Sequence, residues 1–329
     1  MGSNLSHPHA QPQRVRVPIQ ERACTVGTIT AINGYRANRT LLKKRFCEGG
    51  YDMYETTHFL LFTRTKPPTP MLVHWFTPQE LDANIGDTFV EELKPSGLLK
   101  TAQTFGDIFG AVVCSFFPHD PQRALHLYAL NTLERYHDLL DAETDIEPCD
   151  STINAFARLY KRVFEWQAGE TFLDAGCSFG FLPLLIAEHF QTLSQVTGID
   201  IFTEPFPVVR GIAAKQKLKH VNFIQADLLA ATFSTLGRFD TVTALHILEH
   251  FTEADMYRVL IHLLEVTAKR LILAVPYEPG EAEIVYGHEQ VFTRSKLEAV
   301  GEWCMKQMGG HGRMHYEDCA GGLLLIERM

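Results

Sequence analysis

Residues 172–187 read FLDAGCSFGFLPLLIA, and this stretch decides the fold. It begins with an apolar run that ends at Asp174, continues through a turn with Gly176, Ser178 and Gly180, and closes with an apolar run of helical length. Small residues in such a turn let the backbone approach a ligand closely, and the helix after it presents free N–H groups. The stretch therefore predicts a strand, a ligand-binding turn and a helix in succession.

Strands alternate with helices from about residue 169 to the end. Further strands are predicted at VTGID, VNFIQAD, FDTVTAL and RLILAVP, each followed by a loop or helix. This alternation implies right-handed βαβ units and a mostly parallel sheet with helices on both faces. After a helix at about 293–308, RMHYED and GGLLLIER are joined by a short turn and predict an antiparallel pair. We therefore expect a Rossmann-like, doubly wound α/β domain over 169–329.

Three aspartates follow successive strands of this sheet: Asp174, Asp200 and Asp227. Open α/β sheets bind ligands outside the carboxyl ends of their strands, so these acids are expected to line one crevice. Asp200 is placed to accept hydrogen bonds from ribose hydroxyls, and Asp227 from an exocyclic amine such as that of adenine. The turn alone also fits a dinucleotide, although the third glycine of that motif would fall at Phe181. Together the acids predict a nucleoside ligand.

With these residues in place, the C-terminal half resembles the class I S-adenosylmethionine-dependent methyltransferases. The matching segments are LDAGCSFG, GID, QAD, FDTVTALHILEHF and LILAVP. Ser178 stands where the family often has glycine, and its small side chain keeps the backbone accessible. The resemblance implies S-adenosylmethionine as the cofactor and methyl transfer as the activity. The cofactor-binding residues that it implies are Asp174, Gly176, Cys177, Gly180, Asp200, Ile201, Asp227, Leu228 and Leu245.

The exit of the fourth strand carries the candidate chemistry, in the sequence HILEH. Methyl transfer is an in-line displacement that needs a base only when the nucleophile must lose a proton. We predict His246 as that base, with activity rising near its unperturbed pKa of about 6.5, and His250 and His288 as further catalytic residues. Because several histidines gather near the donor, a small-molecule acceptor with a reactive oxygen is favoured.

A metal site is the alternative reading of the same residues. His246, Glu249, His250 and His288 supply ligand types that could converge on a divalent cation. The resemblance extends to metal-dependent branches that methylate vicinal diols of quinols or RNA ends, which carry Glu-x-x-Glu-His and a later histidine. Here His246 replaces the first glutamate. In a simpler reading, LEH only begins the next helix.

Two other functions stay open at this point, a nicotinamide-dependent oxidoreductase and a non-catalytic subunit that binds S-adenosylmethionine. A protease is excluded, because H-x-x-E-H here straddles a strand end and is not set within a helix.

Residues 21–118 predict a smaller, β-rich α+β accessory domain for substrate binding or dimerisation. Its short β-prone runs are ACTVGTITAI, HFLLFT, MLVHWF and GAVVCSFF, separated by breaks with Gly and Pro. A helical link over 119–168 follows, whose first helix should begin at Asp120 and Pro121 and whose second should span about 151–166. Residues 1–20 are polar and are expected to form a disordered tail.

Composition limits the class of protein. The 329 residues should hold roughly two domains, and 46% hydrophobic residues allow a sizeable core. The net charge of -9 disfavours nucleic acid as a partner. No apolar run approaches the roughly 18 residues of a membrane helix, and no signal peptide is evident. The seven cysteines show no CxxC pair, so we expect neither a disulfide framework nor a zinc knuckle, and a reducing cytoplasmic location.

Overall fold

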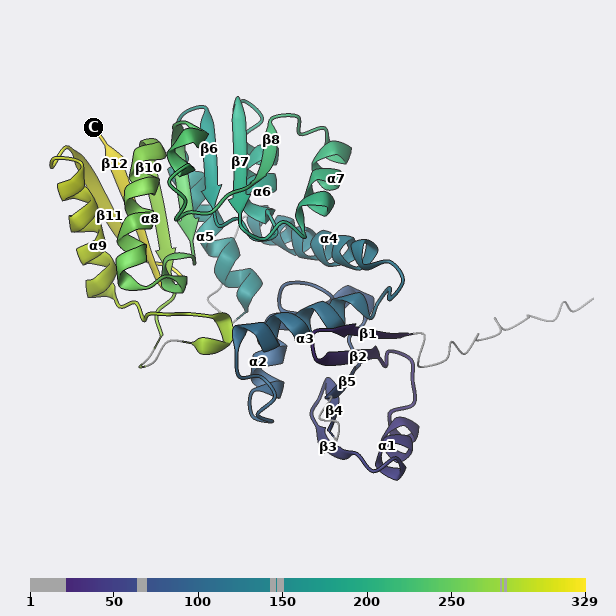
Figure 1. Cartoon of the computed structure of the whole chain (residues 1–329). Coiled ribbons are helices and arrows are strands. Elements are labelled where there is room, and N and C mark those ends of the chain that lie inside the picture. The colour runs from purple at the N-terminus through teal and green to yellow at the C-terminus, as the bar shows by residue number, and fades with distance from the viewer. Residues whose placement is uncertain (1–21, 64–69, 143–145, 147–150, 279, 281–282) are drawn as a thin grey trace, which may run out of the picture.

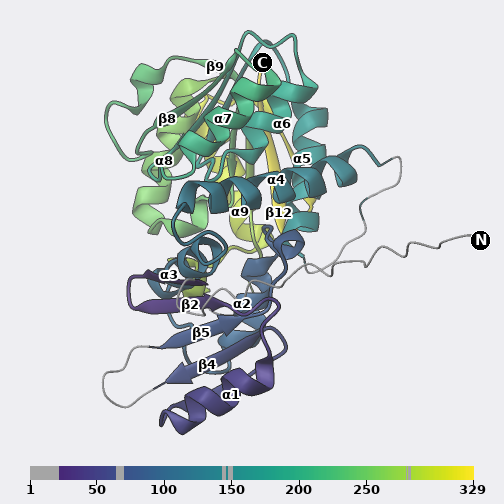
Figure 2. The ribbon, with the colours of Figure 1, turned by 90° about the vertical axis from the view of Figure 1, so that its right-hand side faces the viewer.

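The structure is a computed structural model that describes residues 22–63, 70–142, 146, 151–278, 280 and 283–329. Among these residues, strands form a seven-stranded sheet in the C-terminal half and a five-stranded sheet in the N-terminal half (Figure 1). Helix α4 (Pro121–Leu140) runs between the two sheets in Figure 1 and in the perpendicular view of Figure 2. The tail predicted at 1–20 lies outside the described residues.

The larger sheet consists of β6 (Thr171–Ala175), β7 (Gln195–Asp200), β8 (Val221–Gln225), β9 (Phe239–Leu245), β10 (Thr267–Val275), β11 (Gly312–Asp318) and β12 (Gly322–Arg328). Their order is β11-β12-β10-β9-β6-β7-β8. Neighbours from β10 to β8 run parallel, whereas β12 is antiparallel to both β10 and β11. This confirms the predicted Rossmann-like sheet and its antiparallel pair.

Helices cover both faces of this sheet. They are α5 (Thr152–Trp166), α6 (Phe181–His189), α7 (Phe206–Gln216), α8 (Glu253–Val266) and α9 (Arg294–Gln307). Along β10, Ile272 and Ala274 join the core that includes α4 to α7, whereas Leu271 and Leu273 join the core under α8 and α9. Consecutive strand side chains point to opposite faces, so a sheet covered twice is mostly apolar, and its buried polar side chains, such as Thr243, are hydrogen-bonded within the sheet. Polar chemistry is therefore confined to its edges.

The accessory unit is built on the smaller sheet. It consists of β1 (Ala23–Val26), β2 (Ile29–Asn33), α1 (Arg39–Glu48), β3 (Asp52–Glu55), β4 (Phe59–Thr63), β5 (Met71–His74), α2 (Ile85–Leu93) and α3 (Ala102–Cys114), with strand order β1-β2-β5-β4-β3. Phe59, Leu72 and Ile108 of this unit belong to the same buried cluster as Phe172 and Phe181 of the large domain. The two halves thus share one apolar core.

The strand predicted at GAVVCSFF is wrong, because α3 extends to Cys114. Ile108, Ala111 and Val112 are all buried at the three- and four-residue spacing of one helix face. Valines favour strands by their local preference, but burial against β1 and β2 decides the outcome here.

The two helices of the predicted link are confirmed. The Asp120 side chain accepts a hydrogen bond from the Arg123 backbone N–H and caps α4. Likewise, Ser151 accepts from the Asn154 backbone N–H and caps α5. Because α4 packs on α5 and α7, both helices form part of the layer that covers the large sheet.

A disulfide joins Cys24 of β1 to Cys114 at the end of α3, with Cα atoms 5.8 Å apart. The expectation of no disulfide was therefore wrong for this pair. The two cysteines are 90 residues apart in the sequence, and the packing of α3 on β1 brings them together.

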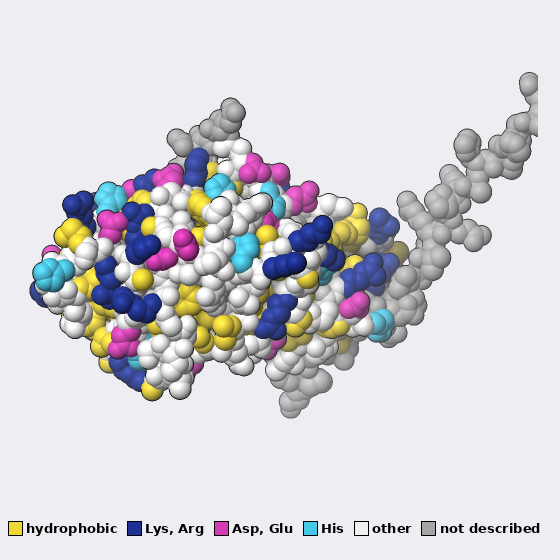
Figure 3. Space-filling model, turned by 90° about the horizontal axis from the view of Figure 1, so that it is seen from above, with side chains coloured by type: hydrophobic (Ala, Val, Ile, Leu, Met, Phe, Trp, Pro, Cys, Tyr) yellow, Lys and Arg dark blue, Asp and Glu magenta, His cyan; other side chains and the backbone are white. Residues whose placement is uncertain are grey.

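The surface drawn in Figure 3 intersperses Lys and Arg side chains with acidic and apolar ones. Within the described residues, no helix combines the length and the apolar character needed to cross a membrane.

Breaking the disulfide should destabilise the protein. Cys24→Ala should lower the free energy of unfolding by about 2 to 5 kcal/mol, since the bond closes a long loop of the unfolded chain. Urea unfolding with and without reductant would measure this, with Cys47→Ser, at an exposed free thiol, as the control. Equal unfolding midpoints for the oxidised and reduced wild type would contradict the bond.

His74 makes stability depend on pH. It is fully buried, its Nε2 lies 2.7 Å from Ser115 Oγ, and burial lowers its pKa to about 3. Below pH 6.5 this histidine is protonated in the unfolded chain but stays neutral in the folded chain. Its contribution should therefore lower the free energy of unfolding as pH falls from about 6.5 towards 3. His74→Asn should flatten the fall in unfolding midpoint between pH 7.5 and 5, whereas His311→Asn, at an exposed histidine, should change the slope less. Identical slopes in all three proteins would refute this role.

Candidate active site

The turn after β6 brings the backbone against two other elements. Gly176 and Gly180 have φ angles of +79° and +73°. A Cβ atom on Gly176 would lie 2.8 Å from Ile247 Cδ1, and one on Gly180 would lie 2.4 Å from the Phe223 ring. Both the left-handed backbone and the close approach require glycine. The turn therefore lies directly against the exit of β9, where Ile247 is found.

Two acids border this turn. Asp174 is buried at the end of β6 and accepts a 2.7 Å hydrogen bond from Thr243 Oγ1, and burial raises its pKa to about 7 against the effect of that bond. The Asp200 carboxylate accepts from the backbone N–H groups of Ser178 (2.7 Å) and Phe202 (2.9 Å). Asp200 thus ties the turn to the loop after β7.

Asp227 completes the row of acids. Its carboxylate accepts a 2.8 Å hydrogen bond from the Leu229 backbone N–H and is exposed. In the parallel register, Asp174 is paired with Gly198 of β7, and Asp200 with Gln225 of β8. The three acids accordingly follow one carboxyl edge, as the sequence predicted.

The apolar candidates at this edge differ in accessibility. Leu228, Leu245 and Cys177 are buried, and burial raises the pKa of the Cys177 thiol. By contrast, Ile201 is 56% exposed and Phe202, which the sequence analysis missed, is 65% exposed. Two large apolar side chains exposed directly after Asp200 are suited to contact a planar ligand. The run IDIF contains the signal that could have identified Phe202.

His246 leaves β9 in a left-handed conformation with φ +52°, which is uncommon for a residue with a side chain. Its ring lies 5.0 Å from that of Phe156 in α5, and its Nε2 is buried without a hydrogen-bond partner among the described residues. Burial, and then the neighbouring His288 and His250, lower the pKa of His246 to about 4. The pH dependence expected near 6.5 is therefore displaced well downwards, and the imidazole is neutral at pH 7.

Glu249, His250 and His288 converge beside His246. Their ligand-type atoms lie within 4.8 Å of one another, and His246 Nδ1 lies 3.7 Å from Glu249 Oε1. Burial raises the pKa of Glu249 to about 8 and lowers that of His250. Three of the four candidate residues thus gather in one cluster and the fourth adjoins it. The letters LEH form a short 3-10 turn (Leu248–His250) ahead of α8, not the first turn of that helix.

The accessory unit contacts the segment that precedes His288. The ring of Phe105 in α3 meets that of Tyr286 edge-on at 5.5 Å, and Lys94 pairs with Glu283 at 2.7 Å. Phe105 and Tyr286 were not predicted as site residues, because nothing in their local pattern shows that they meet. The N-terminal half therefore borders the edge that carries the histidines.

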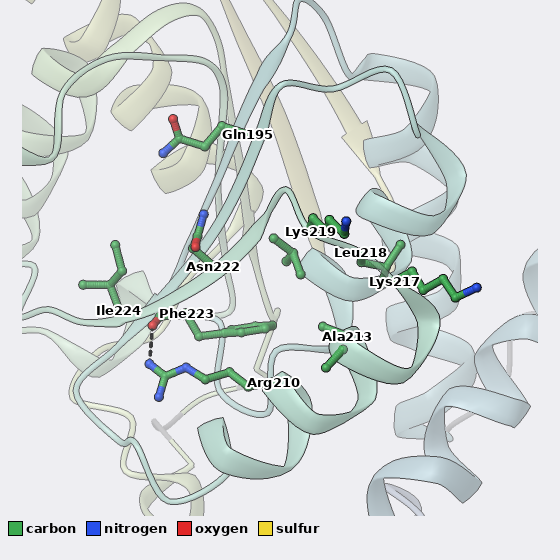
Figure 4. Close-up of a pocket in the computed structure, with 11 residues that line it drawn as sticks. Gln195, Arg210, Ala213, Lys217, Leu218, Lys219, Asn222, Phe223 and Ile224 are labelled. Atoms are coloured by element: carbon green, nitrogen blue, oxygen red, sulfur yellow. Dashed lines mark hydrogen bonds between the residues drawn. The ribbon is translucent and has the colours of Figure 1, made fainter.

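Two other features were not part of the predicted site. Tyr277, which follows the end of β10, has its hydroxyl hydrogen-bonded to that of Tyr316 in β11. A hollow of about 670 Å³ lies between α7 and the amino end of β8 (Figure 4). It is lined by Gln195, Arg210, Ala213, Ala214, Lys217, Leu218, Lys219, Val221, Asn222, Phe223 and Ile224.

Comparison with known proteins connects this geometry to a family. Residues 172–270 match the model of a methyltransferase domain. The chain is 29% identical over 143 residues to (S)-coclaurine N-methyltransferase of Papaver somniferum, covering 40% of this chain and 39% of that protein. It is 33% identical over 97 residues to the ubiquinone biosynthesis O-methyltransferase of Serratia proteamaculans, covering 29% and 39%. The chain thus spans about two fifths of the length of these relatives.

Solved structures also match parts of the chain at low sequence identity. Magnesium protoporphyrin IX methyltransferase from Synechocystis PCC 6803 is 17% identical with a TM-score of 0.42, covering 61% of this chain and 94% of that one. An O-methyltransferase family protein from Burkholderia thailandensis is 16% identical with a TM-score of 0.42, covering 77% and 88%.

The family match runs from β6 into the start of β10 and includes the glycine turn and the three acids. This match favours a methyltransferase over the nicotinamide-dependent oxidoreductase that the sequence left open. Residues 172–270 therefore form a methyltransferase domain of the S-adenosylmethionine-dependent kind, and S-adenosylmethionine is the cofactor of that domain.

Proposed function

We propose that this chain transfers the methyl group of S-adenosylmethionine to an oxygen atom of a small molecule. One observation carries the proposal: His246 precedes Ile247, whose side chain is within contact distance of the glycine turn at Gly176. A side chain at the carboxyl end of β9, such as that of His246, lies where an acceptor must approach the methyl donor. The cluster of Glu249, His250 and His288 adjoins the same point.

In the proposed reaction, His246 accepts the proton of the acceptor hydroxyl group. The acceptor oxygen attacks the methyl carbon while its proton passes to the neutral imidazole, and the bond from that carbon to sulfur breaks with its electron pair remaining on sulfur. S-adenosylhomocysteine then leaves. The Nε2 atom of His246 is suited to this task, since it is buried and no described residue occupies it. His250 and His288 act as further polar groups around the acceptor.

The surroundings favour an acceptor with an apolar body. Phe156 lies against His246, and Phe105 and Tyr286 lie at the boundary with the accessory unit. Relatives named as N-methyltransferases and as an O-methyltransferase support a small-molecule acceptor. We favour oxygen because histidines gather at the donor edge, which suits removal of a hydroxyl proton. A homodimer formed through the accessory unit and a cytoplasmic location stay predictions.

Loss of Asp200 should abolish tight cofactor binding. Asp200→Ala should weaken S-adenosylhomocysteine about 10- to 150-fold, because a charge-assisted acceptor worth about 1.5 to 3 kcal/mol is removed. Calorimetric titration would measure the affinity. Asp240→Ala is the matched control, since Asp240 also accepts from two backbone N–H groups, those of Glu170 and Thr171, but at the opposite edge of the sheet. Unchanged affinity in a folded Asp200→Ala protein would refute the site.

Loss of His246 should remove turnover but not cofactor binding. His246→Ala should lower kcat by about 10² to 10⁴, while the affinity for S-adenosylhomocysteine stays within about twofold, since a base acts in the transition state. Transfer of a labelled methyl group to a panel of phenols, catechols, carboxylic acids and amines would identify an acceptor and then compare the variants. A wild-type rate in His246→Ala would exclude the base, and no transfer to any oxygen acceptor alongside transfer to amines would overturn the preference for oxygen.

A further inference from the structure

Strand β11 forms a long and regular edge of the large sheet. It is the outermost strand on its side (Figure 1), and its seven residues pair one to one with β12 without a bulge. It contains neither Lys nor Pro. The other sheet edges are shorter or protected: β1 and β3 have four residues each, and the Arg210 guanidinium donates to the Phe223 carbonyl oxygen of β8 at 2.6 Å. Regular, unprotected edges are templates for pairing with another chain.

The outer edge of β11 has backbone groups without partners in the part of the chain that the structure describes. In the turn before β12, the Cys319 N–H donates to the Gly321 carbonyl oxygen at 3.0 Å, so Cys319 faces β12. Helix α9 packs on one face of β11 and Trp166 of α5 contacts His315 on the other, but no hydrogen bond from them reaches the outer edge. Backbone groups alternate between the two edges of a strand, so those pointing outwards belong to Gly312, Met314, Tyr316 and Asp318.

We propose that β11 pairs with β11 of a second copy of this chain, antiparallel and with two-fold symmetry, so that one sheet runs through both copies. In the register that uses all seven residues, Gly312 lies opposite Asp318 and Met314 lies opposite Tyr316. These are the positions whose backbone groups point outwards, so each such pair can exchange both of its N–H···O bonds. His315 then lies on the two-fold axis. The inference depends on the fold and not on the proposed function.

The charges are complementary in this register. Arg313 faces Glu317 of the second copy at positions without backbone hydrogen bonds between the strands, where opposite side chains lie closest. Arg313 is exposed and pairs with no carboxylate of the described residues, whereas Glu317 already contacts Arg162 of α5. Two-fold symmetry makes this contact twice. A second copy therefore supplies the carboxylate that Arg313 lacks within its own chain.

The other face of β11 supplies apolar contacts. Met314 is 43% exposed and borders a hollow of about 580 Å³. In the proposed dimer, Tyr316 of the second copy lies opposite Met314 and beside this hollow. Methionine side chains adapt to a neighbouring surface and make favourable contacts with aromatic rings. The same short strand thus provides both a charge and a ring at the positions where its own copy needs them. The other residues that line the hollow are Glu302, Met305, Lys306, Gly309 and Gly310.

Sedimentation equilibrium of the full-length protein tests the dimer. We expect the wild type to dimerise, and Arg313→Glu should raise the dissociation constant at least about tenfold, because two ion pairs become two repulsions. Met314→Pro should abolish the dimer, since it removes an outward N–H at an edge position where proline is tolerated. Lys219→Glu, the same change of charge just before β8 at the opposite edge of the sheet, is the matched control and should leave the dissociation constant unchanged.

Cross-linking tests the register. Only His315 faces itself across the axis, and the opposite Cα atoms of such a pair, about 4.5 Å apart, lie within the range of a disulfide. In a Cys47→Ser background, which removes the exposed native thiol, His315→Cys should form a covalent dimer under a mild oxidant. His311→Cys is the control, since His311 is exposed but precedes the strand, and it should not cross-link.

The outcomes decide the proposal without any measurement of methyl transfer. A wild type that stays monomeric at every concentration would overturn it. A wild-type dissociation constant in folded Arg313→Glu and Met314→Pro would also overturn it, and Arg313→Glu alone decides if Met314→Pro does not fold. A dimer that fails to cross-link through His315→Cys would contradict the register. Failure of the proposed function would leave the dimer standing, and a monomeric protein that transfers methyl groups would overturn only the dimer.

Discussion

A parallel sheet covered by helices on both faces offers a ligand no access to its interior side chains, and this constraint determines where the site can lie. From Leu271 to Val275 of β10, consecutive side chains enter the two apolar cores in turn, so neither face is free to bind a ligand there. Polar side chains can act only where strands end. Asp174, Asp200 and His246 all stand at such ends, and the parallel direction of β6, β7 and β9 brings those ends to one edge.

The cofactor edge is organised by its own hydrogen bonds. Asp200 accepts from two backbone N–H groups, one in the glycine turn and one after β7. The left-handed glycines then hold the turn against Ile247 and Phe223. A site held in this way loses little freedom when its ligand binds, which favours affinity.

Desolvation governs the histidine edge. The same burial that raises the pKa of Glu249 to about 8 lowers the pKa of His246 to about 4, so both groups favour their neutral forms although they are 3.7 Å apart. A buried ion pair forms only where attraction and hydrogen bonds exceed the loss of hydration, and Glu249 lacks those bonds among the described residues. His246 is therefore a neutral base at pH 7. The accessory unit reaches this region through Phe105 and Tyr286.

The sequence by itself determined the C-terminal sheet, its glycine turn, its acids and the helices after Asp120 and Ser151. These features rest on apolar periodicity, turn residues and helix caps, which act over a few neighbouring residues. Tertiary structure alone decided that 110–114 is helical, because burial against β1 and β2 outweighs the local preference of valine for strands. It also decided the pairing of Cys24 with Cys114, the approach of His288 to Glu249 and the displaced pKa of His246. Each of these depends on contacts between segments far apart in the chain and on the exclusion of water between them, and no local pattern encodes either.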